Sequence, residues 1–276
     1  MENMQTYSVL MAVYYKENAE YLKAAIESML KQTIPPDDFV LVCDGPLTDQ
    51  LNHVIEKYEK DSSGIQVVRL AENSGLGNAL NAGLQYCKND LVARMDSDDI
   101  ALSDRCEKQI RRFEQNKNLA LCSGTIAEFQ DTPEKIIAYR KVPSLYTDIL
   151  KFAKKRNPMN HMAVMFRKKA VMEAGNYIEV NLAEDYYLWA RMLKKGFEAE
   201  NIEDVLVYAR IGNGMYKRRG GITYIKSVCE LQKLFLEMHF ISPLQYIWNC
   251  TLRSCVYIWP ESWRKAFYNK VLRVGK

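Results

Sequence analysis

Three carboxylates stand within four residues in the segment Asp96-Ser97-Asp98-Asp99, which closely follows the apolar run Leu91-Val92-Ala93. Carboxylates this close repel one another unless a cation neutralises them. Mg²⁺ and Mn²⁺ prefer oxygen ligands, and they commonly hold phosphates as well. The segment therefore indicates either a site for a metal-bound diphosphate or, since aspartate is a favoured N-cap residue, an acidic loop that caps the following helix.

A second acidic pair, Glu184-Asp185, precedes the aromatic-apolar run Tyr186-Tyr187-Leu188-Trp189. Acidic residues at the start of a helix interact favourably with the helix dipole, so helix capping would again explain the pair. The alternative is a general base for a hydroxyl that becomes acidic only as it attacks, a role that typically contributes about 10²–10⁴-fold to a rate.

The first hundred residues alternate strand and helix patterns that would position these groups. Strands are predicted at 7–14, 39–43, 65–70 and 91–95, and helices at 19–32, 51–58 and 76–87. Such alternation predicts an α/β fold with a mostly parallel sheet flanked by helices on both faces. Ligands of such sheets bind at the carboxyl ends of the strands, where Asp44 and Asp96 both fall. This shared location favours a functional site over capping.

The remaining pattern is less regular. A charged helix is predicted from 104 to about 116, one or two strands over 119–129, a strand at 162–166 and a helix at 185–195. From about 222 the pattern is wholly helical. The glycines of Gly75-Leu76-Gly77 do not make a dinucleotide-binding loop, because Leu80 stands where the third glycine is needed and the stretch follows the third strand.

Composition limits the class of protein. The chain has 276 residues, 48% apolar and 26% charged, and a net charge of +4, which is too small to indicate a nucleic-acid partner. Its seven cysteines form no CxxC pair and predict buried thiols in a reducing compartment. The N-terminus lacks the basic stretch of a signal peptide, and no apolar run reaches the ~18–20 residues that span a bilayer. We expect a cytoplasmic protein, either free or peripheral on the inner face of the membrane.

Four features occur in a recognisable order: an apolar strand that ends in Val13-Tyr14, Asp44 after the second strand, Asp96-Ser97-Asp98 after the fourth, and a late Glu184-Asp185. This order resembles the inverting family-two glycosyltransferases, which have the GT-A fold. The stretch 73–83 resembles their segment before the DxD motif, and the strings 157–168 and 210–221 resemble bacterial members that build surface polysaccharides. The resemblance implies a GT-A domain over 1–210, followed by a C-terminal loop and helical extension over 211–276.

The resemblance also implies a role for each matching position. Asp185 would be the catalytic base, and Glu184 would orient the base or the substrate. Asp96 and Asp98 would be ligands of Mn²⁺ or Mg²⁺, whereas Asp99 would cap a helix or support the ligands. The nucleotide sugar would be bound by Val13, Tyr14, Glu17, Asp44, Asn73, Gly77, Arg94, Asp96, His161, Arg218 and Arg219, with Asp44 accepting a hydrogen bond from uracil.

Two of these positions leave a choice open. His161 is one of three histidines, and a single histidine is more often a structural group than a metal ligand, so we expect it in the wall of the site. Lys217-Arg218-Arg219, followed by two glycines, would be either a loop that closes over UDP or an ordinary solvated loop.

Residues 243–276 combine tryptophans, tyrosines and six lysines or arginines, with Glu261 as their one side-chain carboxylate. Aromatic side chains beside cations suit a membrane headgroup interface. A helical cap with a solvated basic face fits equally well.

The leading hypothesis is a metal-dependent, inverting transferase. It would move a hexose or N-acetylhexosamine from a UDP-sugar to a hydroxyl of a polyprenyl-diphosphate-linked saccharide, in the synthesis of capsule, exopolysaccharide or O-antigen. One alternative is a nucleotidyltransferase that makes the sugar nucleotide, although Tyr15-Lys16-Glu17 stands where its Gly-rich loop is expected. The other is a non-catalytic scaffold subunit of a polysaccharide-assembly complex.

Overall fold

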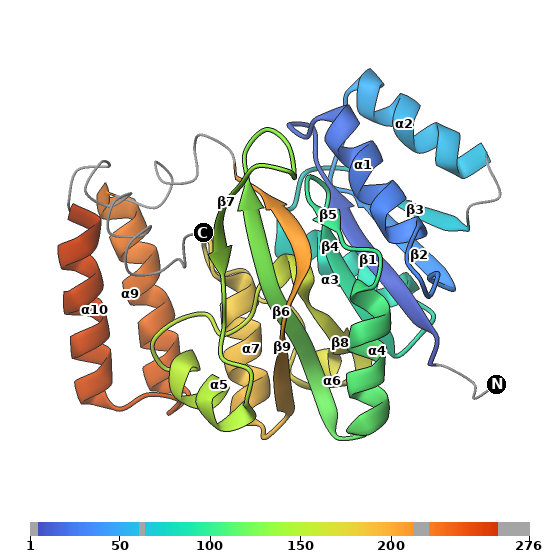
Figure 1. Ribbon diagram of the computed structural model, residues 1–276. Coiled ribbons are helices and arrows are strands. Elements are labelled where there is room, and N and C mark those ends of the chain that lie inside the picture. The colour runs from blue at the N-terminus through green and yellow to red at the C-terminus, as the bar shows by residue number, and fades with distance from the viewer. Residues whose placement is uncertain (1–4, 61–63, 212–220, 259–276) are drawn as a thin grey trace.

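A single mixed sheet with helices on both faces forms the body of the protein in the computed structural model, which describes residues 5–60, 64–211 and 221–258 (Figure 1). The strands are β1 (Tyr7–Val13), β2 (Asp38–Cys43), β3 (Ile65–Arg69), β4 (Leu91–Asp96), β5 (Ile100–Ala101), β6 (Leu119–Phe129), β7 (Ile136–Arg140), β8 (Met165–Arg167) and β9 (Glu198–Arg210). Their order across the sheet is β3-β2-β1-β4-β8-β6-β9-β5, and β7 pairs with β6.

The helices are α1 (Ala19–Leu30), α2 (Asp49–Lys60), α3 (Leu76–Tyr86), α4 (Arg105–Gln115), α5 (Tyr146–Ala153), α6 (Lys168–Glu173), α7 (Glu184–Lys194), α9 (Gly221–Glu237) and α10 (Pro243–Ile258), with a 3₁₀ turn, η1, at His161–Ala163. The half of the sheet from β3 to β4 is wholly parallel. β8 then joins β4 to β6 through antiparallel pairs, and β6 pairs with β9 in parallel. The predicted α/β architecture is confirmed, and the second half of the sheet is more mixed than the first.

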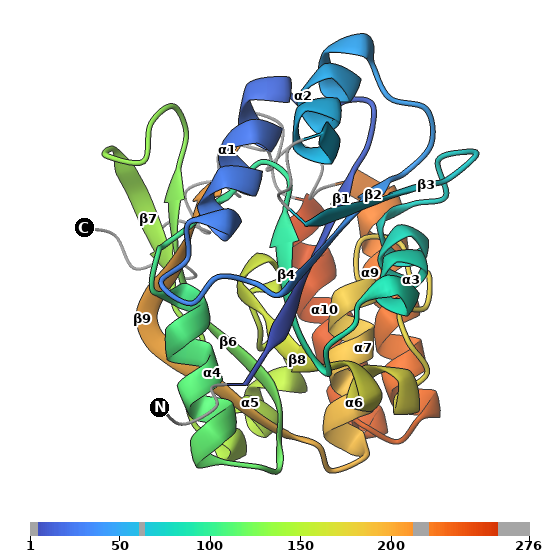
Figure 2. The ribbon, with the colours of Figure 1, turned by 90° about the vertical axis from the view of Figure 1, so that its right-hand side faces the viewer.

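Two apolar layers cover the two faces of the sheet. On one face, Val9 and Met11 of β1 pack with buried residues of α1, α2 and α4. On the other, Leu10 of β1 packs with residues of α3, α5, α6, α7 and α9. Figure 2 shows α1 and α4 on one side of β1, and α3 and α7 on the other. Because both faces are covered, β1 and β2 are buried almost throughout and read as continuous apolar runs.

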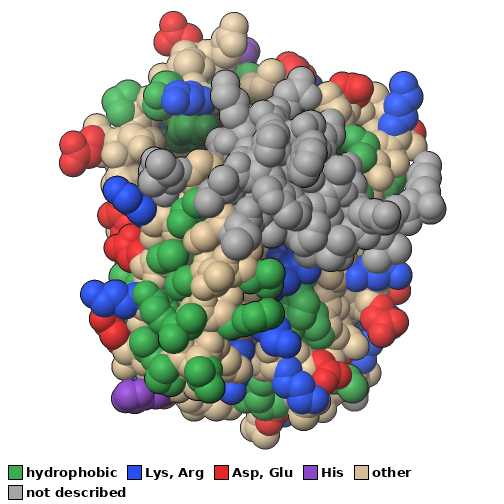
Figure 3. Space-filling model, turned by 90° about the vertical axis from the view of Figure 1, so that its left-hand side faces the viewer, with side chains coloured by type: hydrophobic (Ala, Val, Ile, Leu, Met, Phe, Trp, Pro, Cys, Tyr) green, Lys and Arg blue, Asp and Glu red, His purple; other side chains and the backbone are tan. Residues whose placement is uncertain are grey.

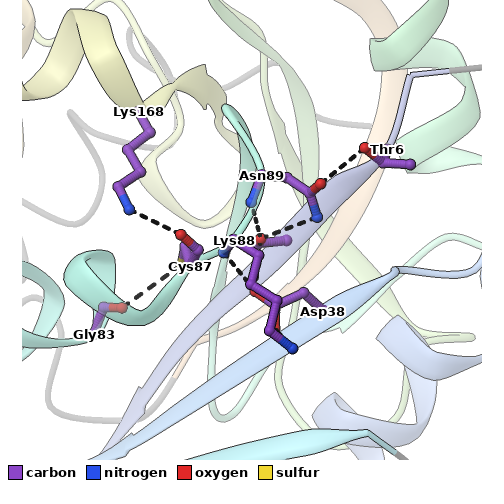
Figure 4. Close-up of polar contacts among 8 residues, drawn as sticks. Thr6, Asp38, Gly83, Cys87, Lys88, Asn89 and Lys168 are labelled. Atoms are coloured by element: carbon purple, nitrogen blue, oxygen red, sulfur yellow. Dashed lines mark hydrogen bonds and ion pairs between the residues drawn. The ribbon is translucent and has the colours of Figure 1, made fainter.

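Polar contacts connect the elements at one end of the sheet (Figure 4). Asp44 and Asp96 lie at the other end. The buried Asp38 carboxylate accepts hydrogen bonds from the Ser8 hydroxyl at 2.8 Å and the Lys88 backbone N–H at 2.9 Å. Lys168 of α6 donates to the carbonyl of Cys87 at 2.8 Å. These bonds connect four parts of the chain: β1, β2, α6 and the turn that follows α3. They fix the position of β1 relative to β2 at the end where both strands begin.

Several local predictions need correction. The strand predicted at 162–166 begins instead as η1, because the Ala163 N–H donates to the Asn160 carbonyl at 2.9 Å, and β8 starts only at Met165. The irregular region contains α5, α6 and β7, which the pattern did not reveal. The long strand β9 pairs in parallel with β6, and only the two-residue β5 follows it in the strand order, so the end of the less regular region also contributes a strand to the sheet.

The helices α9 and α10 lie side by side next to α5 and α7 (Figure 1). Leu231 and Phe235 of α9 belong to the same core as α7, and the division of the chain at 210/211 stays a prediction. None of the helices in the described ranges is both long and apolar enough to cross a bilayer. Four of the described cysteines are buried, two are half-buried, and all six are free thiols, as predicted.

Candidate functional site

One cleft of about 890 Å³ collects five of the predicted site residues: Arg94, Asp96, Asp98, His161 and Asp185. They come from the end of β4, from η1 and from the start of α7. The cleft continues between the end of β9 and the helices α9 and α10. The two acidic groups that are distant in sequence therefore face the same space.

The first group is the carboxylate cluster after β4. Oxygen atoms of Asp96, Asp98 and Asp99 all lie within 4.8 Å of one another. Burial, with the nearby charges of Asp96 and Glu17, raises the pKa of Asp98 to about 7. Burial and the same cluster raise the pKa of Asp99 well above its usual range. An all-oxygen donor set whose carboxylates cannot all ionise fits a hard divalent cation, which would relieve the repulsion.

Arg210, at the end of β9, donates two hydrogen bonds to this cluster. Its backbone N–H donates to Asp99 Oδ1 at 2.7 Å, and its Nε donates to the Asp98 carbonyl at 3.1 Å. The guanidinium lies over the rings of Tyr21 and Phe129, 3.7 and 4.6 Å from their centroids. Arg210 thus fixes the backbone that presents the carboxylates.

Arg94 is fully buried within β4 and donates from Nη2 to Asp96. In the described part of the chain, its Nε and Nη1 have no hydrogen-bond partner. Buried donors without partners cost roughly 1–3 kcal/mol each. Since Arg94 lines the cleft, an anionic ligand would remove this cost.

The second acidic group is held by an asparagine and an arginine. Asn157 Nδ2 donates to Asp185 Oδ2 at 2.6 Å. Arg140, the last residue of β7, donates to the Asn157 carbonyl at 3.1 Å and to Asn160 Oδ1. Asn160 is fully buried and also donates to the Gly124 carbonyl of β6 at 2.7 Å. The sheet therefore fixes the segment that orients Asp185.

Burial raises the pKa of Asp185, although the bonds from Asn157 and from the Tyr186 backbone N–H act in the opposite direction. Burial and the charge of Asp185 also raise the pKa of Glu184. A carboxylate with a raised pKa is a stronger base when ionised, which suits proton abstraction from a hydroxyl. The chain enters this helix through Leu182 at φ 61, a conformation unusual for a branched residue and one that often marks a functional turn.

His161 lies in the wall of the cleft, the position predicted from the sequence. Its Nε2 is 3.0 Å from the hydroxyl of Tyr177, and the Trp189 ring packs against it with centroids 5.9 Å apart. Burial, with the charge of Arg94, lowers the pKa of His161 well below its usual range, so the ring is neutral near pH 7.

Asp44 lies beside the cleft, not in its lining. Its carboxylate accepts hydrogen bonds from the backbone of Ser74 at 2.7 Å and Gly75 at 3.1 Å, and from Asn73 Nδ2 at 2.9 Å. At Gly45 a Cβ would lie 2.6 Å from the Asn73 nitrogen, so the close approach of this loop requires glycine. Asp44 therefore holds the loop that leads into α3, and its role toward uracil stays a prediction.

The other predicted nucleotide-binding positions lie around the same strand ends. Val13 is buried, and Tyr14 is 39% exposed beside it. Glu17 accepts from the Ser97 hydroxyl at 2.8 Å, which connects the loop after β1 to the carboxylate cluster. Gly77, near the start of α3, lies next to the start of α7, since a Cβ built there would be in ordinary contact with Glu184 Cβ at 3.6 Å. Arg218 and Arg219 lie outside the described residues.

Several functional candidates carry no motif that sequence reasoning could use. Arg140 ends a strand that was not predicted, and Arg210 and Asn157 appeared only within longer strings. The cations Lys155, Arg156 and Arg253 line the far part of the cleft. Their convergence depends on β7, β9 and α10 meeting in space, which no local pattern reveals.

Comparison with known proteins matches this arrangement. The profile of the family described as "Glycosyl transferase family 2" matches residues 8–172. A protein of Haemophilus influenzae named "Uncharacterized glycosyltransferase" is 42% identical over 97% of this chain and 99% of its own length. The "UDP-Gal:alpha-D-GlcNAc-diphosphoundecaprenol beta-1,3-galactosyltransferase" of Escherichia coli is 39% identical over 97% of this chain and 96% of its own. AmsE of Erwinia amylovora, named an amylovoran biosynthesis glycosyltransferase, is 37% identical over 96% and 98%.

Solved structures share the fold. The mannosyltransferase PcManGT of Pyrobaculum calidifontis, solved with GDP-Man and Mn²⁺, gives a TM-score of 0.65 at 16% identity and covers 92% of this chain and 70% of its own. TarS 1–349 of S. aureus, solved with UDP-GlcNAc, gives a TM-score of 0.65 at 18% identity and covers 97% and 76%.

Proposed function

Because the chain belongs to glycosyl transferase family 2 and has the GT-A fold predicted for it, we propose that it is an inverting, metal-dependent transferase that uses a UDP-sugar and a lipid-linked saccharide. The observation that carries the proposal is the single cleft into which both the Asp98 cluster and Asp185 project. The Escherichia coli relative, which matches nearly the whole chain, supports UDP-galactose and N-acetylglucosamine-diphospho-lipid as the first pair to test.

The residues after β4 would bind the donor. Asp96 and Asp98 would hold Mn²⁺ or Mg²⁺, and Asp99 would support Asp98. The metal would supply charge stabilisation for the departing UDP, an effect worth several kcal/mol. Arg94 would donate from its two unpartnered nitrogens, Nε and Nη1, to the donor's diphosphate or ribose. Glu17, through Ser97, would keep the loop after β1 next to this group.

The start of α7 would act on the acceptor. The acceptor hydroxyl would attack the anomeric carbon on the face opposite UDP. Its oxygen forms the new glycosidic bond, its proton passes to the Asp185 carboxylate, and the bond between the anomeric carbon and UDP breaks. Glu184 and the neutral His161 would shape the space around the sugar, and His161 would bear no charge that could compete for the metal-bound diphosphate.

The test separates the two groups by their readouts. Asp98→Ala is expected to abolish the Mn²⁺-dependent rise in melting temperature that UDP produces, since the ligand stabilises the folded state only when it binds. Asp185→Asn is expected to keep that rise while it lowers transfer about 10²–10⁴-fold. Wild-type levels of transfer by either purified variant would contradict the assignment.

The same assay addresses the alternative functions. A nucleotidyltransferase would form a UDP-sugar from UTP and a sugar 1-phosphate, whereas we expect no product from that pair. A non-catalytic scaffold would show neither transfer nor metal-dependent UDP binding. Action on a lipid-linked substrate would place the protein at the cytoplasmic face of the membrane, and flotation with lipid vesicles measures that association.

A further inference from the structure

The cleft extends beyond Asp185 toward α10, and the two ends of the cleft differ in charge. The end near β4 carries Asp96, Asp98 and Asp99, whereas the far end carries Lys155, Arg156 and Arg253. If the proposed function holds, a metal ion and the donor's diphosphate neutralise the acidic end. The positive charges of the three far-end residues would then favour a second anion that needs no metal.

The chain and its contacts bring these cations near the proposed base. Asn157, which donates to Asp185 at 2.6 Å, directly follows Lys155 and Arg156 in the chain. Arg253 of α10 donates to the Lys155 carbonyl. Burial raises the pKa of Tyr186, the residue after Asp185, and the charge of Arg253 acts to lower it. An anion bound here would lie within a short saccharide's length of the reacting hydroxyl.

The adjoining face of α10 is apolar and solvent-exposed. Leu244, Ile247, Trp248 and Leu252 are 79%, 60%, 67% and 52% exposed, and both Trp248 and Leu252 line the cleft. Figure 3 shows hydrophobic side chains gathered at the lower left of this face, with lysine and arginine side chains to their right. Large apolar side chains grouped on an exposed helix mark an interaction surface rather than an ordinary solvated one.

We propose that Lys155, Arg156 and Arg253 bind the diphosphate of a lipid-linked acceptor, while the apolar face of α10 contacts the first part of its hydrocarbon chain. The inference rests on the proposed function and adds the acceptor's binding site. The occupant follows from the chemistry, since a molecule with a diphosphate directly joined to a hydrocarbon matches cations directly beside an apolar helix face. It also predicts that few sugars separate the accepting hydroxyl from the diphosphate.

Calorimetry with farnesyl diphosphate in metal-free buffer tests this site without turnover. We expect the wild type to bind farnesyl diphosphate more tightly than it binds inorganic diphosphate or farnesol. Lys155→Ala/Arg156→Ala and Arg253→Gln should each weaken binding about tenfold per cation removed, as expected for charged hydrogen bonds. Trp248→Ala should weaken the binding of farnesyl diphosphate but not of inorganic diphosphate. A matched control, Lys57→Ala/Lys60→Ala on α2, removes two exposed cations far from α10 and should change nothing (Figure 1).

The cation variants must also keep their Mn²⁺-dependent response to UDP, which reports an intact fold and donor site. Retention of that response without any loss of farnesyl diphosphate binding would overturn the acceptor site and leave the proposed function standing. Loss of the UDP response in the wild type would instead refute the proposed function. If the cation variants lost binding only to vesicles of phosphatidylglycerol, the patch would be a general membrane contact and the inference would be wrong.

Discussion

Removal of the Asn157 amide tests the contact that controls the proposed base. In Asn157→Ala the Asp185 carboxylate loses the donor that lies 2.6 Å from its Oδ2. That bond favours the ionised form of Asp185, whose pKa burial raises and this bond lowers. Without it the carboxylate is destabilised relative to the protonated acid, and the pKa of Asp185 rises further.

The size of the change follows from the charge on the acceptor oxygen. A hydrogen bond to a charged group contributes about 1.5–3 kcal/mol, and one pKa unit corresponds to about 1.4 kcal/mol. Loss of the bond should therefore raise the pKa of Asp185 by about one to two units. Because the base must be ionised to accept a proton, the acidic limb of the pH profile of kcat/KM should move upward by the same amount, and activity should recover at high pH.

The assay is the initial rate of UDP release measured across pH with saturating metal and donor. Asn181→Ala is the matched control, since Asn181 also lies in the cleft but donates to the Ser227 hydroxyl at 2.9 Å and not to the base. Its acidic limb should not move. An acidic limb in Asn157→Ala that stays in place, or moves downward, would refute Asp185 as the base whose ionisation limits the rate.

Two further predictions concern the fold that supports the site. Asp38→Ala removes the buried acceptor of two hydrogen bonds. It should lower the free energy of unfolding by about 2–4 kcal/mol in a denaturant titration. Lys88→Ala removes an ion-pair partner of Asp38 that is 71% exposed, so it should lower that free energy by at most about 1 kcal/mol. Similar losses in the two variants would contradict this reading. Gly83→Ala places a Cβ 2.4 and 2.6 Å from side chains of the sheet and should cost about 1–3 kcal/mol by the same measurement. Gly77→Ala in the same helix meets only contacts of 3.5 Å or more and should cost nothing, since alanine is the better helix former. An equal cost in the two variants would contradict the steric explanation.

The sequence was sufficient to predict the position of a site residue where that residue stands at the end of a regular strand. Asp44 and the segment Asp96-Ser97-Asp98 follow buried strands, and parallel strands bring such ends to one edge of a sheet. The place of Asp185 beside them followed instead from the resemblance to family-two glycosyltransferases. His161 was predicted to lie in the wall of the site because it stands between Asn160 and an apolar segment.

The supporting residues could not be predicted in this way, because their positions depend on the order of the strands. Arg140 reaches Asn157 only because β7 pairs with β6, and Arg210 reaches Asp99 only because β9 runs beside β6. Asp44 illustrates a different limit: its place at a strand end was clear, but the four donors of the loop after β3 that surround its carboxylate were not. Neither strand pairing nor loop closure is a local property of the sequence.

Arg94 explains how one small cleft holds both an acidic cluster and a neutral histidine. Burial lowers the pKa of His161, and the positive charge of Arg94 acts in the same direction. Burial raises the pKa of Asp185, and Arg94 opposes that rise. Arg94 also pairs directly with Asp96. A single cation cannot balance every carboxylate here, which is why burial and mutual repulsion still raise the pKa of Asp98 to about 7. A metal-bound diphosphate would supply both missing partners, positive charge for Asp98 and acceptor oxygens for Arg94. Among the described residues, the protein alone therefore leaves the charge of Asp98 unbalanced and two donors of Arg94 without partners, and the proposed metal-bound donor would supply both partners.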